Sequence, residues 1–554
     1  PFQLENDEVA IKEDSSDTGK TIAKKNKEKT QKKTADKPYP TVEVKIDETG
    51  LTDRIESLPV APGNYYNLTA TNEGLYYVAA SFRTPGHLKF FDLKDKKETE
   101  TGDINSYSIS NNQKKIIFKK GDDFFIEDVS KIKIEAKNKL NLSGLKINTD
   151  LHAEWKQIFD ESWRQMRDYF YDPNMHGVNW KAMHDKYAVL LPYVNHRNDL
   201  TYIIGEMIGE LSIGHAYVNS GDRPEAERIK MGLLGATFSR DKSGYYKIDS
   251  ILSGESWDKT LVSPLRQPGV NVKKGDYIIS INGKDVSRLD NIYQALIGKA
   301  NQAIEILVNS KASVTGSRKI FVKPIDDESN LYYHEWVQQN IAKVTKASGG
   351  KIGYLHIPDM GPEGLNQFAR YFYPQLDKEA LIIDDRGNGG GNVSPMIIER
   401  LRRVPGLGTM MRNAKTANIK PDAQVGPKIC LIDQYSASDG DLFPYQFQFY
   451  KIGPLLGQRT WGGVVGIRGS LPFIDGADMR KPEFAHFSAD GSRFIIEGYG
   501  VDPDIEVVND PHQEYLGNDI QLLRAIEEMK RKLAEPGPKG VPPIPAFPDK
   551  SGKK

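Results

Sequence analysis

Residues 428–450 read KICLIDQYSASDGDLFPYQFQFY, and this stretch predicts a strand, a tight turn and a helix. The apolar run at 429–432 is long enough for one buried strand, and small polar residues follow it at 436–440. Asp441 is of a residue type that often begins a helix. A helix that starts directly after such a turn points its positive end at the turn, where negative charge is stabilised.

Ser438 lies in this turn. A hydroxyl that attacks a carbonyl creates an oxyanion, which the positive end of a helix stabilises. Ser438 is therefore the candidate nucleophile. The alternative is that the serines of this turn only cap the helix.

Length and composition limit the classes of protein to consider. A chain of 554 residues exceeds one hydrophobic core, so three to five domains are expected. The 75 basic and 75 acidic residues balance, which gives no overall field that favours nucleic acid or a membrane surface. No apolar run approaches the roughly 20 residues of a membrane helix. Cys430 is the only cysteine, which excludes an intrachain disulfide, and the start at Pro1 rather than Met indicates part of a longer protein.

The composition of the N-terminal region changes near residue 41. Residues 1–40 are polar and lysine-rich, and we expect a flexible linker or loop, with a basic nucleic-acid arm as the alternative. Residues 41–148 contain short alternating strands, for example at 74–80 and 115–118, with turn residues between them. This pattern resembles one to two blades at the end of a β-propeller, whose other blades would lie outside this sequence.

Residues 149–226 predict an α-helical domain. Apolar residues recur at helical spacing in three stripes, the first of which contains Trp155, Phe159 and Met166. Gly214 ends the third helix just before His215. A histidine on such a turn can point outward as a base, although it can also be a satisfied polar group.

Residues 227–325 predict a small β-rich domain. The segment 269–286 reads GVNVKKGDYIISINGKDV and resembles the PDZ signature, in which such a sequence ends one strand and begins the next. PDZ domains bind extended peptides by strand addition. The alternative is a PDZ-like domain that acts only as a structural spacer.

Residues 326–535 alternate strands with helices, which is typical of an α/β domain. After the strand at 380–384 the sequence reads DRGNGGGN, and glycines there allow a backbone amide to approach a ligand closely. The segment lacks the features of a phosphate-binding loop, so an oxyanion hole or a simple turn are the two interpretations. Residues 536–554 are rich in proline and glycine, and we expect an unstructured tail.

Four motifs occur in an order that resembles the tricorn protease family, a relative of the carboxyl-terminal processing serine peptidases. They are GHAY at 214–217, DRGNGGG at 385–391, SDGD at 438–441 and EGYGVDPD at 497–504, with the PDZ-like segment after the first. The resemblance covers roughly residues 41–533. It implies a multidomain fold that comprises a propeller end, an α-helical cap domain, a PDZ-like domain and a catalytic α/β domain of the crotonase or ClpP-like spiral type.

The resemblance also implies the roles of the site residues. Ser438 would be the nucleophile, and His215 would be its general base and later the acid that protonates the leaving amine. Glu497 would belong to the set of residues that orients the base and the charge that develops on it. A hydroxyl nucleophile requires such a base, and the base requires an orienting partner.

Backbone amides would complete the site. The resemblance implies an oxyanion hole made by the amides of Gly390 and Asp439, with Gly389 and Gly391 as candidate substrate contacts. No metal and no cofactor are expected.

Two positions depart from the family pattern. The archaeal family has a serine directly before the histidine, whereas this sequence has Gly214. We therefore expect Glu497 to reach His215 directly or through water, or Ser212 to take the place of the missing serine. The segment 405–412, which aligns with the part that supplies an acidic specificity residue, contains no acid, so no preference for basic residues is predicted.

These observations favour a serine peptidase that hydrolyses peptides. The alternatives are a carboxyl-terminal processing protease and an inactive peptide- or ligand-binding scaffold on the same fold. The resemblance further implies peptide substrates, a missing N-terminal propeller half of the same protein and a homo-oligomer, a hexamer in the family. It implies a cytoplasmic location, with a periplasmic or exported protein as the alternative, and no binding of nucleic acid or membrane.

Overall fold

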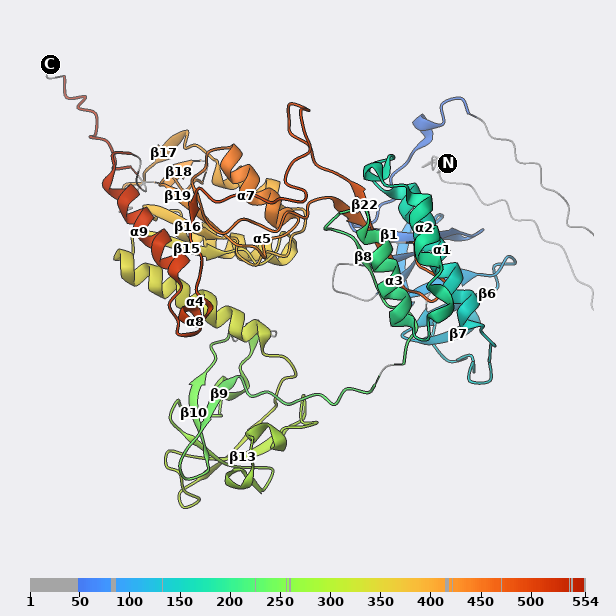
Figure 1. Ribbon diagram of the computed structural model, residues 1–554, viewed down its shortest axis with the longest axis horizontal. Coiled ribbons are helices and arrows are strands. Elements are labelled where there is room, and N and C mark those ends of the chain that lie inside the picture. The colour runs from blue at the N-terminus through green and yellow to red at the C-terminus, as the bar shows by residue number, and fades with distance from the viewer. Residues whose placement is uncertain are drawn as a thin grey trace, which may run out of the picture. The chain divides into compact units, whose positions relative to one another are not determined.

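The computed structural model describes residues 48–552 except 81–85, 132, 225, 256, 259–260, 414–417, 421, 470, 538 and 540–541. The linker expected at 1–40 lies outside these residues. The chain divides into two compact units, Pro1–Asn148 and Thr149–Lys554, which are described separately (Figure 1). Among the described helices, none combines the length and the apolar character that a membrane crossing requires.

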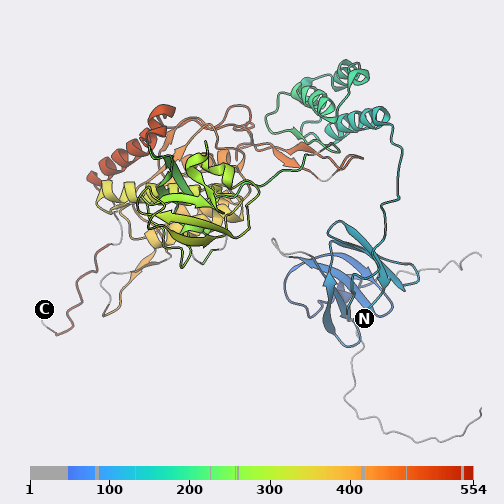
Figure 2. The same ribbon diagram turned by 90° about the horizontal axis from the view of Figure 1, so that it is seen from below.

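The first unit consists of two antiparallel sheets that share one core (Figure 2). The four-stranded sheet contains β1 (Asn64–Ala70), β2 (Gly74–Ala80), β3 (His87–Asp92) and β4 (Lys97–Asp103), and the three-stranded sheet contains β5 (Ser106–Ile109), β6 (Lys115–Lys120) and β7 (Asp123–Asp128). Tyr76 and Phe90 of the first sheet pack with Ile116 and Phe118 of the second. Strands joined in chain order agree with the predicted blades, and the propeller end stays a prediction.

The second unit begins with three helices that pack around one core: α1 (Leu151–Tyr169), α2 (Trp180–Ala188) and α3 (Arg197–Gly209). Asp150 caps α1, because its side chain accepts hydrogen bonds from the amides of the first turn. A segment from far along the chain completes this domain. Strand β8 (Tyr217–Val218) pairs with β22 (Met479–Phe484), which also pairs with β21 (Gly466–Arg468), and Phe473 and Met479 enter the helical core.

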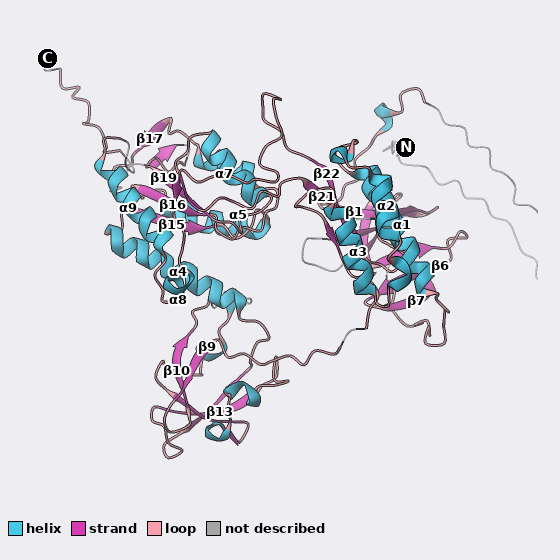
Figure 3. Cartoon of the chain, viewed as in Figure 1, coloured by secondary structure: helices cyan, strands magenta, loops and turns pink. Residues whose placement is uncertain are grey.

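The predicted PDZ-like domain is an antiparallel sheet with one shared core (Figure 3). Its strands are β9 (Ala236–Arg240), β10 (Tyr246–Ile251), β11 (Tyr277–Ile281), β12 (Lys284–Asp285), β13 (Ile304–Asn309) and β14 (Arg318–Val322). The order in the sheet is β14-β13-β11-β10-β9, and β12 pairs with β11. The motif at 269–286 ends in the β11–β12 hairpin, whose turn is made by Asn282 and Gly283, both with positive φ.

The α/β domain is built on a parallel sheet whose five strands follow one another in chain order. The strands are β15 (Ile352–His356), β16 (Ala380–Asp384), β19 (Lys428–Ile432), β20 (Leu455–Gly457) and β23 (Ile505–Glu506). The helices are α4 (Ser329–Ser348), α5 (Pro362–Phe372), α6 (Ser394–Leu401), α7 (Asp439–Phe449), α8 (Pro511–Tyr515) and α9 (Ile520–Ala534), and a hairpin of β17 (Leu407–Thr409) and β18 (Asn418–Lys420) follows α6.

Helices cover both faces of this sheet. Helices α5, α6 and α7 contribute to the core on one face, and α4 and α9 contribute to the core on the other. Alternate strand residues divide between the two, so Ile383 and Cys430 point to the first core, whereas Ile382 and Leu431 point to the second. Because the strands are parallel, the segments after β16, β19 and β20 emerge at one edge, which is where such sheets carry their sites.

Candidate active site

Ser438 lies between β19 and α7 in the strand, turn and helix that the sequence predicts. It is the residue before the first turn of α7, with φ 57° and ψ −118°, and its side chain makes no capping hydrogen bond. A non-glycine residue with positive φ is strained by about 1–3 kcal/mol, and such residues persist where surrounding contacts hold them. The capping interpretation of Ser438 is therefore wrong, and its half-buried hydroxyl is available for chemistry.

The neighbouring serine has a structural role. Ser436 is fully buried, and its hydroxyl donates to the carbonyl oxygen of Asp385 at 2.8 Å. It also lies 3.2 Å from a carboxylate oxygen of Asp433. These contacts tie the turn before Ser438 to the glycine-rich segment after β16.

The glycine-rich segment lies against the nucleophile. Gly390 has φ 83°, and a Cβ added there would come within 2.7 Å of the Cβ of Ser438. Only glycine allows this close approach. The amide of Gly390 donates to Asn388 Oδ1 at 2.9 Å, and the amide of Gly389 donates to the carbonyl oxygen of Pro358 at 3.2 Å. The amide of Gly390, the expected oxyanion donor, is thus already engaged by Asn388. Within the described residues the amide of Gly391 has no such acceptor, so it is a second candidate donor.

Asn388 is the residue that sequence reasoning missed, although it stood inside the quoted glycine motif. It is fully buried, and its carbonyl oxygen accepts the amide of Ala437 at 2.9 Å. Its side-chain Nδ2 donates to Asp385 Oδ1 at 2.9 Å and to the carbonyl oxygen of Ile357 at 3.0 Å. The backbone and side chain of this one residue thus link the glycine-rich segment, the turn before Ser438 and the residue after β15.

Buried carboxyl groups surround this turn. Burial raises the pKa of Asp385 well above its ordinary value, and the nearby carboxylate of Asp384 raises it further. Asp384 itself is held ionised by Arg386, whose guanidinium lies 2.6 Å from it. Asp439 accepts hydrogen bonds from the amide and the hydroxyl of Ser394 at 2.9 and 2.5 Å, which fixes the first turn of α7. The amide of Asp439 lies at the positive end of this helix, as an oxyanion donor requires.

His215 is buried after the end of α3, with 8% of its surface exposed. Its Nδ1 lies 2.6 Å from the carbonyl oxygen of Val465, which assigns the proton to Nδ1 and leaves Nε2 as the basic nitrogen. The ring of Trp461 stands edge-on to the imidazole at 6.0 Å, and the amide of Trp461 donates to the carbonyl oxygen of Ser436 at 3.0 Å. Trp461 therefore connects the base to the nucleophile turn. Among the described residues, Ser438 and His215 share no hydrogen bond.

Glu497 is connected to His215 through the backbone of Val465. Its Oε2 accepts the amides of Val464 and Val465 at 2.7 and 2.8 Å, and its Oε1 accepts the amide of Gly214 at 3.3 Å. The carbonyl of Val465 then holds the imidazole. A direct bond between Glu497 and His215, one of the arrangements we expected, is not found within the described residues, and the peptide of Val465 provides the link instead.

Gly214 leaves space beside this carboxylate. A Cβ added there would lie 3.8 Å from Glu497 Oε1 and 3.7 Å from the ring of Trp461, which are ordinary contact distances. The position of the missing serine thus faces Glu497. Ser212 has positive φ at 48°, and no hydrogen bond joins its side chain to His215 or Glu497 in the described part of the chain.

Side chains of the types that bind metal ions also lie close together in the first unit. Among the described residues, His87, Glu100 and Asp103 form the one group close enough together to share a metal ion. His87 Nδ1 lies 2.7 Å from Asp103 on the neighbouring strand, so the group already forms a cross-strand pair. None of the candidate site residues belongs to it.

Comparison with known proteins identifies three parts of the chain. Family models match the Tricorn protease C1 domain at residues 151–209, the Tricorn protease PDZ domain at 232–327 and Peptidase family S41 at 351–507. These matches confirm the predicted order of a helical domain, a PDZ domain and a catalytic α/β domain.

Similar proteins extend the match over most of the chain. Tricorn protease homolog 1 of Streptomyces coelicolor is 33% identical over 531 residues, which are 90% of this chain and 48% of that protein. A tricorn-like protease C-terminal subunit of Sulfurisphaera tokodaii is 35% identical over 512 residues, which are 89% of this chain and 59% of that protein. A crystal structure of the tricorn protease superposes with a TM-score of 0.78 at 30% identity, covering 86% of this chain and 47% of that one.

The chain spans about half the length of the curated relatives that it matches. The family models match the helical, PDZ and peptidase parts of this chain, and the last of these matches contains Ser438 and Glu497. The chain therefore belongs to the tricorn protease family.

Proposed function

We propose that this chain is the catalytic half of a tricorn-type serine peptidase, which hydrolyses peptides through an acyl-enzyme on Ser438. The observation that carries the proposal is the conformation of Ser438. Its backbone is strained at the start of α7, and its hydroxyl makes no capping hydrogen bond. The residue lies beside the glycine-rich segment and at the positive end of this helix. A structural serine would gain nothing from this strain.

In the proposed reaction, the Ser438 hydroxyl oxygen attacks the peptide carbonyl carbon while Nε2 of His215 accepts its proton. The amides of Asp439 and of Gly390 or Gly391 stabilise the oxyanion. The C–N bond then breaks as the imidazolium protonates the leaving amine. Water then attacks the ester carbonyl carbon while His215 accepts its proton. The bond to the Ser438 oxygen breaks as the imidazolium returns that proton to the serine, which releases the peptide acid.

Glu497 acts as a positioning residue in this proposal. Its carboxylate accepts three backbone N–H groups, one of which belongs to Val465, the residue whose carbonyl oxygen binds His215 Nδ1. This arrangement keeps the proton on Nδ1 and favours the imidazolium that forms during attack. His215 and Ser438 share no hydrogen bond among the described residues, and in the proposed reaction they approach when substrate binds, as catalytic pairs often do.

A fluorophosphonate probe tests the assignment, because it reacts with an activated serine hydroxyl. We expect covalent labelling at Ser438, found by peptide mapping, and loss of labelling in the Ser438→Ala variant. A well-folded protein that stays unlabelled and does not cleave peptides would instead support the inactive scaffold. Labelling combined with cleavage only at protein C-termini would favour the processing protease.

The family resemblance also suggests how the protein assembles. We propose that the chain works with an N-terminal propeller half and forms a homo-oligomer, a hexamer by resemblance. A similar protein named as a C-terminal subunit supports a separate catalytic half. Light scattering of the purified chain, alone and with the propeller half, measures the oligomeric state and the association of the two halves. A cytoplasmic location remains a prediction of the resemblance.

A further inference from the structure

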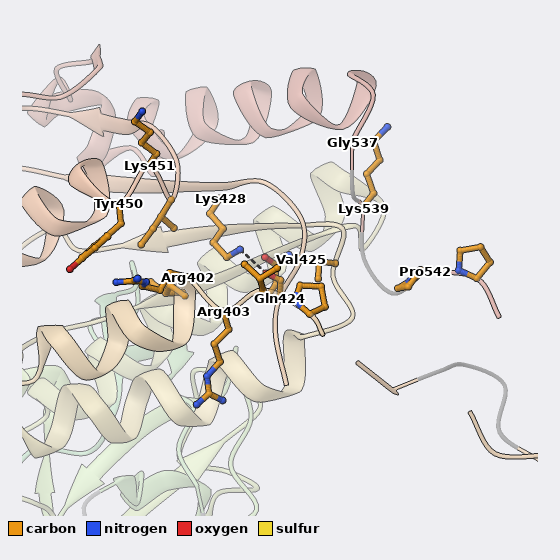
Figure 4. A pocket seen from close by; sticks show the side chains of 15 residues that line it. Arg402, Arg403, Gln424, Val425, Lys428, Tyr450, Lys451, Gly537, Lys539 and Pro542 are labelled. Carbon is orange, nitrogen blue, oxygen red and sulfur yellow. Dashed lines mark hydrogen bonds between the residues drawn. The ribbon is translucent and has the colours of Figure 1, made fainter. Parts of the chain in front are cut away.

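A cavity lies in the α/β domain, at the edge of the sheet opposite Ser438. It has a volume of about 720 Å³ and is lined by the end of α6, the segment before β19, the residues after α7 and the chain after α9 (Figure 4). Lys428 is the first residue of β19, whereas Ser438 follows its last residue. The cavity is therefore separate from the proposed active site. Its size suits a small organic molecule.

The charged groups that line this cavity are all positive. Five basic residues contribute, and none of the fifteen described lining residues is acidic; the basic residues are Arg402, Arg403, Lys428, Lys451 and Lys539. Arg403 is neutralised, because its Nη2 lies 3.1 Å from Glu399. No carboxylate among the described residues pairs with the other four. Several cations around one cavity repel one another, and a bound anion relieves that repulsion.

Lys428 is buried in the wall, with 7% of its surface exposed. Its ammonium group donates to the carbonyl oxygens of Gln424 and Gly426 at 2.6 and 3.3 Å, which accounts for two of its three protons. Burial lowers the pKa of Lys428 to about 8, because no anion compensates for the lost hydration. An anion in the cavity would supply that compensation.

Gln424 gives a second sign of an absent ligand. Its side chain is 2% exposed, its Nε2 donates to the carbonyl oxygen of Lys378 at 3.0 Å, and its Oε1 has no hydrogen-bond partner. A buried acceptor without a partner costs about 1–3 kcal/mol. A hydroxyl or amino group on a ligand would satisfy it.

Arg402 and Tyr450 provide a fixed platform. The guanidinium lies over the tyrosine ring, 4.1 Å from its centre, which orients its edge for bidentate binding of an oxyanion. Apolar side chains fill the rest of the wall, among them Leu401, Val425 and Ile452. The cavity thus combines a cationic region with an apolar one.

We propose that this cavity binds a small organic anion whose charge is carried by phosphate or carboxylate groups. The cationic side chains bind these groups, the apolar wall contacts the carbon skeleton, and Gln424 accepts a hydrogen bond from a hydroxyl or amine. The occupied cavity connects α6, the end of α7 and β19. Binding therefore stabilises the elements on which the nucleophile turn is mounted.

Calorimetric titration of the full chain tests this proposal, with ATP as the phosphate probe and citrate as the carboxylate probe. We expect one of them to bind the parent at a single site, and the preferred one identifies the chemical source of the charge. The double variant Arg402→Ala/Lys451→Ala should bind it roughly tenfold or more weakly, since two charged contacts are lost. Both positions are on the surface, so thermal melting should confirm a folded protein.

The matched control is Lys346→Ala/Lys530→Ala, which removes two exposed positive charges from α4 and α9. Its affinity should equal that of the parent. Three outcomes would overturn the proposal: neither probe binds, both double variants weaken binding equally, or a glutamate-rich peptide binds where both small probes fail. The second outcome would identify a general charge effect, and the third a protein partner.

Discussion

The proposed nucleophile, Ser438, and the proposed base, His215, belong to two regions of one unit that are held in place in different ways. The turn around Ser438 is fixed within the α/β domain by short links to the glycine-rich segment, from Ala437 to Asn388 and from Ser436 to Asp385. His215 is fixed by contacts with residues some 250 positions away in the sequence. The serine region is thus preformed by its own domain, whereas the histidine region depends on docking between domains.

A strand pairing and a buried ion pair explain why the position of His215 depends on distant residues. Strand β8, just after His215, pairs with β22, and Arg197 of the helical domain forms an ion pair with Asp475 at 2.7 Å. Both side chains of the pair are almost fully buried, at 2% and 1% exposed. A buried pair of this kind fixes register, since loss of one partner leaves an uncompensated charge. Changes in the two regions should therefore affect catalysis in different ways.

The largest effect is expected from removal of the nucleophile. Ser438→Ala should lower turnover by about 10⁶ without loss of stability, because the hydroxyl makes the covalent bond and caps nothing. Steady-state peptide cleavage and thermal melting measure the two quantities. Cleavage at the parent's rate would remove Ser438 from the site.

Glu497→Gln tests the histidine region. The amide of glutamine cannot accept all three backbone N–H groups, and it carries no charge to favour the imidazolium. Because the contact with His215 passes through a peptide, we expect turnover to fall by about 10²–10³, less than the ~10⁴ seen when a carboxylate bonds the histidine directly. The loss should appear in kcat rather than in KM, because Glu497 acts through His215. A folded variant whose kcat stays within about tenfold of the parent would contradict this role.

Asn388→Ala tests the serine region. It removes two donors and one acceptor that link the glycine-rich segment to β15 and Asp385, so turnover should fall by about tenfold to a hundredfold through misplaced oxyanion donors. Stability should also fall by about 1–3 kcal/mol because buried partners are left unsatisfied. The change should appear in kcat rather than KM. A variant that loses stability but keeps kcat would assign Asn388 a structural role alone.

Asp441→Asn should change the pH dependence of stability. Burial raises the pKa of Asp441 from 3.8 to about 6, so the folded state holds this proton more tightly than the unfolded state. The resulting stabilisation is present below about pH 4 and is lost as the pH rises through 6, to an extent of about 3 kcal/mol. Asparagine does not titrate. Melting curves from pH 4 to pH 7 should therefore decline less steeply for the variant, and parallel curves would exclude this contribution.

The smallest effect is expected from Gly214→Ser, which restores the family residue before the base. The new Cβ meets its neighbours at 3.7–3.9 Å, and its hydroxyl can reach Glu497. Turnover should stay within about threefold of the parent, since the site already holds Glu497 through the amide of Gly214. A large loss of activity in a folded protein would show that the glycine itself is required.

The sequence by itself determined the local elements and their order. Apolar runs and turn residues predicted β19, the turn at Ser438 and α7, because strand and helix periodicity depends on neighbouring residues. The PDZ motif and the glycine-rich segment could likewise be recognised locally. Family resemblance then paired Ser438 with His215, which no spacing in the sequence could have done.

Only the tertiary structure decided how these parts act on one another. Two contacts join residues far apart in the sequence: the link from Glu497 through the backbone of Val465 to His215, and the packing of Phe473 and Met479 in the helical core. The same is true of the four separate segments that line the cationic cavity. Such contacts use backbone groups and ordinary side chains, so they leave no periodic pattern and depend on the packed fold as a whole.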